Sequence, residues 1–420
     1  MTLAIKLHGL GNYRNSYSAQ RWAMSASTAK EESPGVVVIK VGTSSVLDSS
    51  GQYLALSTIA ALVECIVILR RAGLGVILVS SGAVGVGCQT LGVTTRPKET
   101  ALLQAMAAVG QPKLMAHYES LFGALKQPIA QVLLSADAFG DRSGYRNAQA
   151  TFIQLLALGV VPIVNENDSV AISELKFGDN DTLSALVATM TGARWLFLAT
   201  DVDALYTSNP TAAPKPGEPP ATPIREVADV AAAIRKVEGA GSNSGSQWGT
   251  GGIITKLRAA QLAAAAGCVT CLIHAKRPQD IRSVALEGAT DVGTRFLPFS
   301  KATRTHKRWI MALPVRGDLT VDAGAARAVT EGSSLFAAGL TGAGGMFAVS
   351  EAVRVIDASG AEIARGVCNY SHVQVGLLVG KKSAEYAAAL GWNGPEEIVH
   401  RHNLVLLSDA ARSDDADEVA

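Results

Sequence analysis

The sequence has few cysteines, few charged residues and almost no net charge, and each scarcity argues against a class of protein. Its five cysteines are odd in number and irregularly spaced, so a disulfide framework is not expected. The protein is instead expected in a reducing, cytoplasmic compartment. Only 17% of the 420 residues are charged and 48% are hydrophobic, which argues against long disorder and allows two or three domains. A net charge of +1 gives no bulk attraction to nucleic acid or membrane, so neither is expected as a partner.

The sequence also lacks an uninterrupted apolar helix and a metal-binding cluster. No charged residue occurs between Arg71 and Arg96, but six glycines interrupt this stretch, so it predicts strand, loop and helix start rather than a membrane span. Cys268 and Cys271 form a C-x-x-C pair inside an apolar run without a second pair, which favours buried thiols over zinc. We assign no side chain as a metal ligand, and no Ser-His-Asp order stands out.

What the sequence does contain is a regular alternation of apolar runs and helical patterns from Gly35 to about Phe296. Runs that are apolar throughout predict buried parallel strands, so we expect an α/β fold with a mostly parallel sheet sandwiched by helices. The runs concerned are 36–39, 75–79, 131–134, 160–164 and 195–199, with helical patterns at 54–70, 100–118 and 256–266. Residues 35–300 are therefore expected to form one domain.

A second, smaller domain is expected at residues 307–408, because short alternating runs separated by turn residues replace the earlier pattern. Strands are predicted at 317–321, 345–349 and 352–356. A basic stretch from Arg304 to Arg308 predicts an exposed linker that few contacts cross, so a chain ending near Ala302 is expected to fold and remain active. An apolar face around Trp309 and Ile310 is the risk to this expectation.

The two ends of the chain predict flexible segments. Residues 409–420 are acidic and poor in apolar residues, which favours a disordered tail. Residues 1–34 are rich in serine and have no acidic residue before Glu31. They indicate either an organelle-targeting peptide or a plain flexible extension, with translation starting at Met24 in the second case.

Polar and glycine-rich segments follow several of the expected strands. Lys40 ends the first strand and is placed to meet an anion in the sheet crevice, although a solvated turn lysine explains it equally well. Residues 79–87, Val-Ser-Ser-Gly-Ala-Val-Gly-Val-Gly, follow the second strand, where backbone N–H groups can form an anion-binding nest. Residues 165–168, Asn-Glu-Asn-Asp, follow a third strand and suggest ligand contacts, although such residues are also common in turns.

Three further segments repeat this arrangement. Residues 177–185, Phe-Gly-Asp-Asn-Asp-Thr-Leu-Ser-Ala, place polar side chains at the start of a helix, where free N–H groups can order a ligand, although Asp and Asn also serve simply as caps. Thr200 and Asp201 end another strand. Residues 249–256, Gly-Thr-Gly-Gly-Ile-Ile-Thr-Lys, form a second candidate phosphate cradle that supplies a second cation, Lys256, with a flexible linker as the alternative.

Two lysines and two glycine-rich turns at strand ends suit phosphoryl transfer to a carboxylate. A carboxylate with a pKa of about 4.3 is already ionised at neutral pH, so the reaction needs no general base. The protein must instead reduce repulsion between two anions and neutralise the moving phosphoryl group. Lysines, backbone N–H groups and Mg²⁺ do this.

These motifs, in this order, resemble the amino acid kinase family and, within it, the glutamate 5-kinases. The resemblance covers about residues 36–300, and the part from 307 to 367 looks like the PUA domain that often follows this kinase. Ala204 and Asn209 depart from the family, which usually has glycine and aspartate there. The strings that carry the resemblance are 40–44 (KVGTS), 81–85 (SGAVG), 107–111 (AAVGQ), 165–168 (NEND), 178–181 (GDND) with 183–185 (LSA), and 249–252 (GTGG) with Thr255 and Lys256.

The resemblance implies roles for individual residues. The catalytic residues would be Lys40 and Lys256, which would flank the transferred phosphoryl group, and Asp181, which would orient both lysines. L-Glutamate would be held by Ser81, Asp168 and Asn180, with Asp168 meeting the ammonium group. ATP would be bound by Lys40, Thr200, Asp201, Thr250, Gly251, Gly252, Ile253, Ile254, Thr255 and Lys256.

The resemblance also implies partners and alternatives. L-Glutamate and ATP are the expected substrates with Mg²⁺ as cofactor, in the first step toward proline. Proline is a candidate feedback ligand, a glutamyl-phosphate reductase a candidate partner, and a homo-oligomer is expected. Two alternatives stay open: another amino acid kinase, acting on N-acetylglutamate or aspartate, and an RNA-binding PUA protein, against which the net charge argues.

Overall fold

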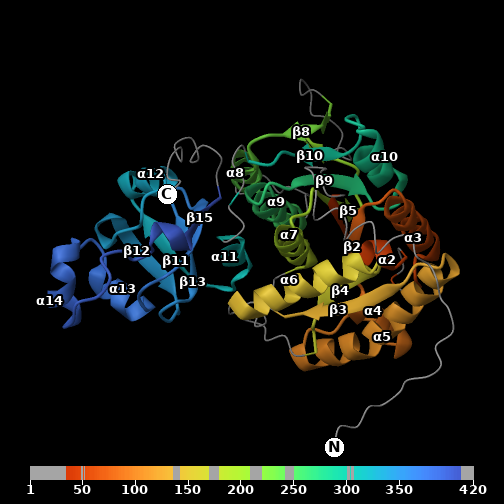
Figure 1. Ribbon diagram of the computed structural model, residues 1–420, viewed down its shortest axis with the longest axis horizontal. Helices are drawn as coiled ribbons and strands as arrows, with labels where there is room; N and C mark the ends of the chain where they lie inside the picture. The colour runs from red at the N-terminus through yellow and green to blue at the C-terminus, as the bar shows by residue number, and fades with distance from the viewer. Residues whose placement is uncertain are drawn as a thin grey trace, which may run out of the picture.

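The computed structural model describes residues 35–48, 51, 53–135, 142–169, 179–208, 220–241, 250–299, 303 and 307–407. Within these ranges the chain forms a larger sheet covered by helices and a smaller sheet toward the C-terminus (Figure 1). None of the helices in the described ranges is both long and apolar enough to cross a bilayer. The expected flexible segments 1–34 and 409–420 lie outside the described residues, so those expectations remain predictions.

The larger sheet has the strand order β3-β4-β2-β1-β5-β9-β10-β8, and every neighbouring pair is parallel except β9 with β10. This confirms the predicted α/β fold. A separate short ribbon joins β6 (Leu205–Tyr206) to β7 (Pro223–Ile224). The strands of the sheet are β1 (Val36–Val41), β2 (Gly75–Ser80), β3 (Ile129–Leu134), β4 (Val161–Glu166), β5 (Trp195–Thr200), β8 (Glu226–Val227), β9 (Val269–His274) and β10 (Thr294–Phe296).

Two hydrophobic cores lie on the two faces of this sheet, because successive strand residues point in opposite directions. Val38 of β1 packs in one core, whereas Val37 and Ile39 pack in the other. The helices that cover the faces are α2 (Thr43–Val46), α3 (Leu56–Arg71), α4 (Ala83–Thr90), α5 (Thr100–Ala124), α6 (Arg142–Ala157), α7 (Asn180–Thr191), α8 (Val230–Gly241), α9 (Thr250–Ala265) and α10 (Gln279–Glu287). Core residues of α6, α7 and α9 belong to the Val38 side, and those of α3, α5 and α10 to the other.

The cysteines are buried free thiols, as the C-x-x-C spacing in an apolar run predicts. Cys268 and Cys271 belong to opposite cores and are 1% and 0% exposed. Burial raises the pKa of the Cys271 thiol to about 12, so it stays protonated at neutral pH. These thiols therefore serve as small apolar core groups.

Helices α4 and α5 cross in close contact through glycines that leave no room for a side chain. A Cβ added at Gly110 would lie 1.9 Å from the carbonyl oxygen of Ala83, and one at Gly87 would lie 1.9 Å from that of Met106. Both obstacles are backbone atoms, which cannot rotate away. The Gly-x-Gly pattern after β2 thus sets the packing of α4 as well as its turn.

Gly110→Ala is expected to destabilise the protein by about 3 kcal/mol, the upper end of the range for overpacked sites. Gly123, in the same helix, has no heavy atom within 4 Å of the position that an added methyl group would take, so Gly123→Ala should gain about 0.5–1 kcal/mol from helix propensity. Urea denaturation of the two variants measures the difference. Equal midpoints would contradict the close crossing.

The smaller sheet has the order β12-β11-β13-β14-β15 and its own core. Helices α12 (Ala323–Thr330), α13 (His372–Leu378) and α14 (Tyr386–Leu390) accompany it. The domain limits 35–300 and 307–408 stay predictions, although each sheet lies within one of them. The strands are β11 (Val315–Val321), β12 (Leu340–Gly345), β13 (Ala352–Ile356), β14 (Glu362–Val367) and β15 (Leu404–Leu406).

The strand predicted at 345–349 is wrong, because β12 occupies the preceding glycine-rich segment and ends at Gly345. Gly345 has a φ of +81°, which turns the chain out of the strand. Phe347 is then buried over Gly317, where an added Cβ would lie 2.4 Å from the phenyl ring. Phe347 is therefore apolar because it packs in the core after the turn, not because it belongs to a strand.

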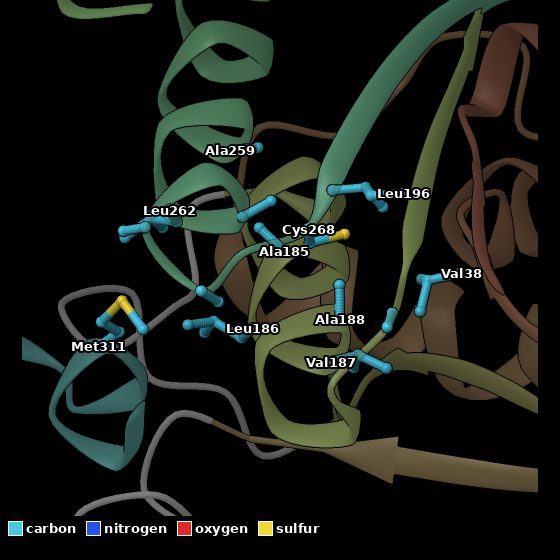
Figure 2. Close-up of a cluster of buried hydrophobic side chains, with 14 of the residues drawn as sticks. Val38, Ala185, Leu186, Val187, Ala188, Leu196, Ala259, Leu262, Cys268 and Met311 are labelled. Carbon is cyan, nitrogen blue, oxygen red and sulfur yellow. The ribbon is translucent and has the colours of Figure 1, made fainter. Parts of the chain in front are cut away.

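The expectation that few contacts cross the basic stretch is also wrong. Helix α11 (Arg308–Ala312) lies between the two sheets (Figure 1), and Ile310 and Met311 are fully buried. Met311 faces the same apolar cluster as Leu186 of α7 and Leu262 of α9 (Figure 2). Residues of β14 and β15 join this cluster too, so one core is continuous from the larger sheet to the smaller one. Arg304 and His306 lie outside the described residues.

Candidate active site

The polar segments predicted from the sequence meet at one edge of the larger sheet. Because β4, β2, β1, β5 and β9 are parallel neighbours, their carboxyl ends lie side by side. Lys40 is the penultimate residue of β1, Ser81 follows β2, and Thr200 ends β5. The N-termini of α7 and α9 bring Asp181 and Lys256 to the same place, as their shared contacts show.

Asp181 binds both lysines. Lys40 Nζ lies 2.5 Å from Asp181 Oδ1, and Lys256 Nζ lies 3.1 Å from Oδ2. Thr255 also donates from Oγ1 to Oδ2 at 3.1 Å, and Lys256 donates to the carbonyl oxygen of Gly252 at 3.1 Å. The side chains of Asp181, Lys40 and Lys256 are only 3%, 9% and 15% exposed. Two cations are thus held close together by one carboxylate at the sheet edge.

The charge state of Asp181 follows from two opposing effects. Burial raises the pKa of Asp181, whereas the charges and hydrogen bonds of Lys40 and Lys256 lower it. The lowering effects together outweigh burial, so the pKa of Asp181 is below its usual value. Asp181 is therefore ionised at neutral pH. Its ion pairs stabilise the fold above the unfolded pKa of about 3.9, and this stabilisation is lost as the pH falls through the lower folded value.

The three polar residues at the start of α7 have separate tasks. Asp179 is the N-cap and accepts the backbone N–H of Thr182 at 2.8 Å, so the cap interpretation holds for this residue. Asp181 binds the lysines. Asn180 donates from Nδ2 to Ser81 Oγ at 2.7 Å and to Asn165 Oδ1 at 3.0 Å. One short segment thereby caps its own helix and contacts the ends of β1, β2 and β4.

At the other end of the site, Thr200 donates from Oγ1 to Asp201 Oδ1 at 2.8 Å. Thr200 is 8% exposed, whereas Asp201 is exposed. The glycine-rich segment 250–256 forms the first two turns of α9 rather than a loop. Its backbone N–H groups therefore lie at a helix N-terminus, which is a suitable position for binding an anion.

The structure brings most of the predicted site residues together at this edge. Gly252, Ile253, Ile254 and Thr255 lie in the first turns of α9 with Lys256, and Asp168 lies, partly buried, in the turn after β4. Thr250 and Gly251 start α9, but their surroundings lie outside what the structure describes. Within the described ranges, no three His, Cys, Asp or Glu side chains gather as metal ligands would.

The structure connects two further residues to the site, Asn165 and Gln111, neither of which has an individual role in the sequence-based prediction. Asn165, only 4% exposed, accepts from Asn180 and donates to Gln111 Oε1 at 2.9 Å. Both residues belong to the motifs quoted above. A polar residue as the fifth position of an otherwise buried strand was the signal available for Asn165, but nothing local indicated that Gln111 of α5 reaches it.

Comparison with known proteins identifies relatives that align with most of the chain. Residues 35–274 match the amino acid kinase family and residues 317–390 match the PUA domain. The glutamate 5-kinase of Synechococcus sp. (strain JA-2-3B'a(2-13)) is 50% identical over 374 residues, 89% of this chain and 98% of that protein. The glutamate 5-kinase of Microcystis aeruginosa is 49% identical over 375 residues, which cover 89% of this chain and 96% of that protein. Among solved structures, the carbamate kinase of Giardia lamblia bound to AMP-PNP has a TM-score of 0.44 and 19% identity, with 63% of this chain and 99% of that one covered.

Proposed function

The chain belongs to the amino acid kinase family, with glutamate 5-kinases among its relatives, and we propose that it transfers the terminal phosphoryl group of ATP to the side-chain carboxylate of L-glutamate. The products are ADP and L-glutamyl 5-phosphate, and the reaction is the opening step toward proline. The observation that carries the proposal is the pair of cations, Lys40 and Lys256, that share the Asp181 carboxylate. Two close cations suit a reaction between two anions.

The residues divide the work between binding and charge stabilisation. The carboxylate of the substrate attacks as an ionised nucleophile, so no residue needs to remove a proton from it. Lys40 and Lys256 offset the repulsion between this carboxylate and the phosphoryl group, and their interaction strengthens as charge spreads over the phosphoryl oxygens. Asp181 holds both ammonium groups in place before the substrates arrive, so little reorganisation is needed during transfer.

The two substrates occupy opposite ends of this edge in our assignment. Ser81, Asp168 and Asn180, at the ends of β2 and β4 and the start of α7, hold L-glutamate, with Asp168 pairing with its ammonium group. Thr200, Asp201 and the start of α9 hold ATP, whose phosphates meet the N–H groups of that helix. The lysines lie where the two substrates meet.

Mg²⁺ fits these residues as a companion of ATP. Mg²⁺ in kinases keeps several waters and is held by phosphate oxygens and one or two carboxylates. The Asp181 carboxylate is occupied by lysines, whereas Asp201 is exposed at the nucleotide end and would be the available side chain. When bound, the ion would neutralise phosphate charge.

The substrate proposal is tested by incubating the full-length chain with ATP, Mg²⁺ and single acidic amino acids. ADP release should depend on L-glutamate, and hydroxylamine should trap the acyl phosphate as a hydroxamate. Turnover with N-acetylglutamate or aspartate that equals or exceeds that with glutamate would reject glutamate as the substrate.

Asp168→Asn is expected to weaken L-glutamate binding about 10–100-fold, because one charge-assisted contact to the ammonium group is lost. ATP binding should stay within twofold of wild type. Separate calorimetric titrations of the two ligands measure this, with Asp229→Asn, an exposed carboxylate before α8, as the matched control. A defect in ATP binding alone would reassign Asp168 to the nucleotide or the metal.

The product of the proposed reaction implies a further partner. L-Glutamyl 5-phosphate is an acyl phosphate and is short-lived in water, so we propose that a separate reductase consumes it. Proline as a feedback ligand, a homo-oligomer and a cytoplasmic location belong to the same proposal. Initial rates with and without proline, and the mass of the protein in solution, test the first two.

A further inference from the structure

A row of side-chain amides crosses the substrate end of the site. It runs from Gln131 on β3 through Gln111 on α5 and Asn165 on β4 to Asn180 on α7. Gln111 donates from Nε2 to Gln131 Oε1 at 3.3 Å, Asn165 donates from Nδ2 to Gln111 Oε1 at 2.9 Å, and Asn180 donates from Nδ2 to Asn165 Oδ1 at 3.0 Å. Every bond in this amide row therefore runs in the same direction.

A backbone group favours that direction. The N–H of Glu166 donates to Asn165 Oδ1 at 2.9 Å, and a backbone N–H can only donate. The amide oxygen of Asn165 must therefore face Glu166 and Asn180, and its nitrogen must face Gln111. Asn165 is 4% exposed, so this nitrogen depends on Gln111 Oε1 as an acceptor in place of water.

The direction determines what Asn180 and Ser81 can offer to a ligand. Nδ2 of Asn180 is shared among Asn165 Oδ1, Ser81 Oγ at 2.7 Å and the carbonyl oxygen of Ser80 at 3.4 Å. These contacts use both hydrogens of the amide, so its oxygen is the group left for a ligand. Ser81 Oγ accepts from Asn180, which leaves its own hydrogen free to donate. The site thereby offers an acceptor for an ammonium group beside a donor for a carboxylate.

We propose that Gln111 is a positioning residue that fixes this polarity and so makes the site select substrates that carry an ammonium group. The inference rests on the proposed function, because it assumes that L-glutamate binds at Ser81 and Asn180. Without the Gln111 acceptor, keeping Oδ1 on the Glu166 N–H would leave the buried nitrogen of Asn165 without a hydrogen-bond partner, and this cost would favour rotation of the amide toward another oxygen. The oxygen of Asn165 would then no longer face Asn180, and Asn180 could present its nitrogen to the ligand.

The test compares Gln111→Met, which keeps length but removes the acceptor, with Gln111→Glu, which keeps an acceptor for Asn165. In the full-length chain, Gln111→Met should raise KM for L-glutamate about tenfold while kcat and KM for ATP change less than about threefold. The inhibition constant of glutarate, a dicarboxylate without an ammonium group, should change far less than KM for glutamate. Gln111→Glu should restore near-normal KM for glutamate.

Gln131→Met is the matched control, because it removes only the outermost amide of the row, whose partner Gln111 is accessible to water. It should leave KM for glutamate within about twofold of wild type. Equal losses for glutamate and glutarate in Gln111→Met would indicate general distortion and overturn the inference, as would an unchanged KM for glutamate. A wild-type chain that does not phosphorylate L-glutamate would instead reject the proposed function and the inference with it.

Discussion

Replacing Lys256 or Lys40 by alanine is expected to lower kcat about 10²–10³-fold, while KM for glutamate changes much less. The reason is that these ammonium groups meet charge that grows during phosphoryl transfer, so they contribute more in the transition state than in the substrate complex. Asp181 already holds both groups, at 2.5 and 3.1 Å, which preserves their positions for that step. Steady-state kinetics with ATP and glutamate varied in turn measure the two effects separately.

The Lys40→Ala variant is also expected to lose stability. Lys40 is 9% exposed in its side chain and lies on a central strand, so Lys40→Ala leaves the buried Asp181 with one partner fewer and should lower the melting temperature. Lys236→Ala, an exposed lysine on α8, is the control for loss of a lysine and should leave kcat and melting temperature unchanged. If Lys256→Ala or Lys40→Ala folds and keeps near-normal kcat, that lysine has no part in transfer.

The larger sheet could be predicted from the sequence because its strands are apolar on both faces. The runs at 36–39, 75–79 and 195–199 all became central strands, extended by one or two residues at an end. Three of the four added residues, Lys40, Ser80 and Thr200, are polar and lie at the carboxyl edge. The same rule that places strands in the core therefore places the polar residues after them together.

Long-range partners could not be predicted from local patterns. Asp179, Asn180 and Asp181 are adjacent and chemically similar, yet one caps a helix, one contacts Ser81 and one binds two lysines. Which residue has which task depends on the direction in which each side chain leaves α7. The contact between Gln111 and Asn165 joins residues 54 positions apart, and no periodicity in either segment encodes it.

The position of α11 is another feature that could not be predicted from the local composition. The basic stretch predicts an exposed linker. In the structure, however, the Arg308 side chain donates hydrogen bonds to the carbonyl oxygens of Thr303 and Ala266, at 3.3 and 3.1 Å. Behind it the apolar residues of α11 enter the core against α7. The basic composition of residues 304–308 thus gave no indication that the apolar residues directly after Arg308 are buried.

A chain that ends at Ala302 is therefore expected to lose solubility, whereas one that ends at Leu313 should stay folded and keep glutamate kinase activity. The shorter chain lacks Ile310, Met311 and Leu313, each of which contributes about 1.5–3 kcal/mol by burial. Their sum is comparable with a typical domain stability of about 5–15 kcal/mol. The longer chain retains α11 on the face of α7, the helix that carries Asn180 and Asp181.

A substitution in the full-length chain separates loss of this packing from loss of the smaller sheet. Met311→Ala should lower the free energy of unfolding by about 2–5 kcal/mol and leave kcat nearly unchanged, because Met311 belongs to the apolar cluster, whereas Lys40, Asp181 and Lys256 do not. The chains that end at Ala302 and Leu313 and the full-length Met311→Ala variant are compared by gel filtration, thermal melting and the hydroxamate assay. Two truncated chains that are equally soluble and equally active would show that α11 is dispensable to the kinase fold. A chain ending at Leu313 that is monodisperse but inactive would show that the smaller sheet is needed to complete the active site.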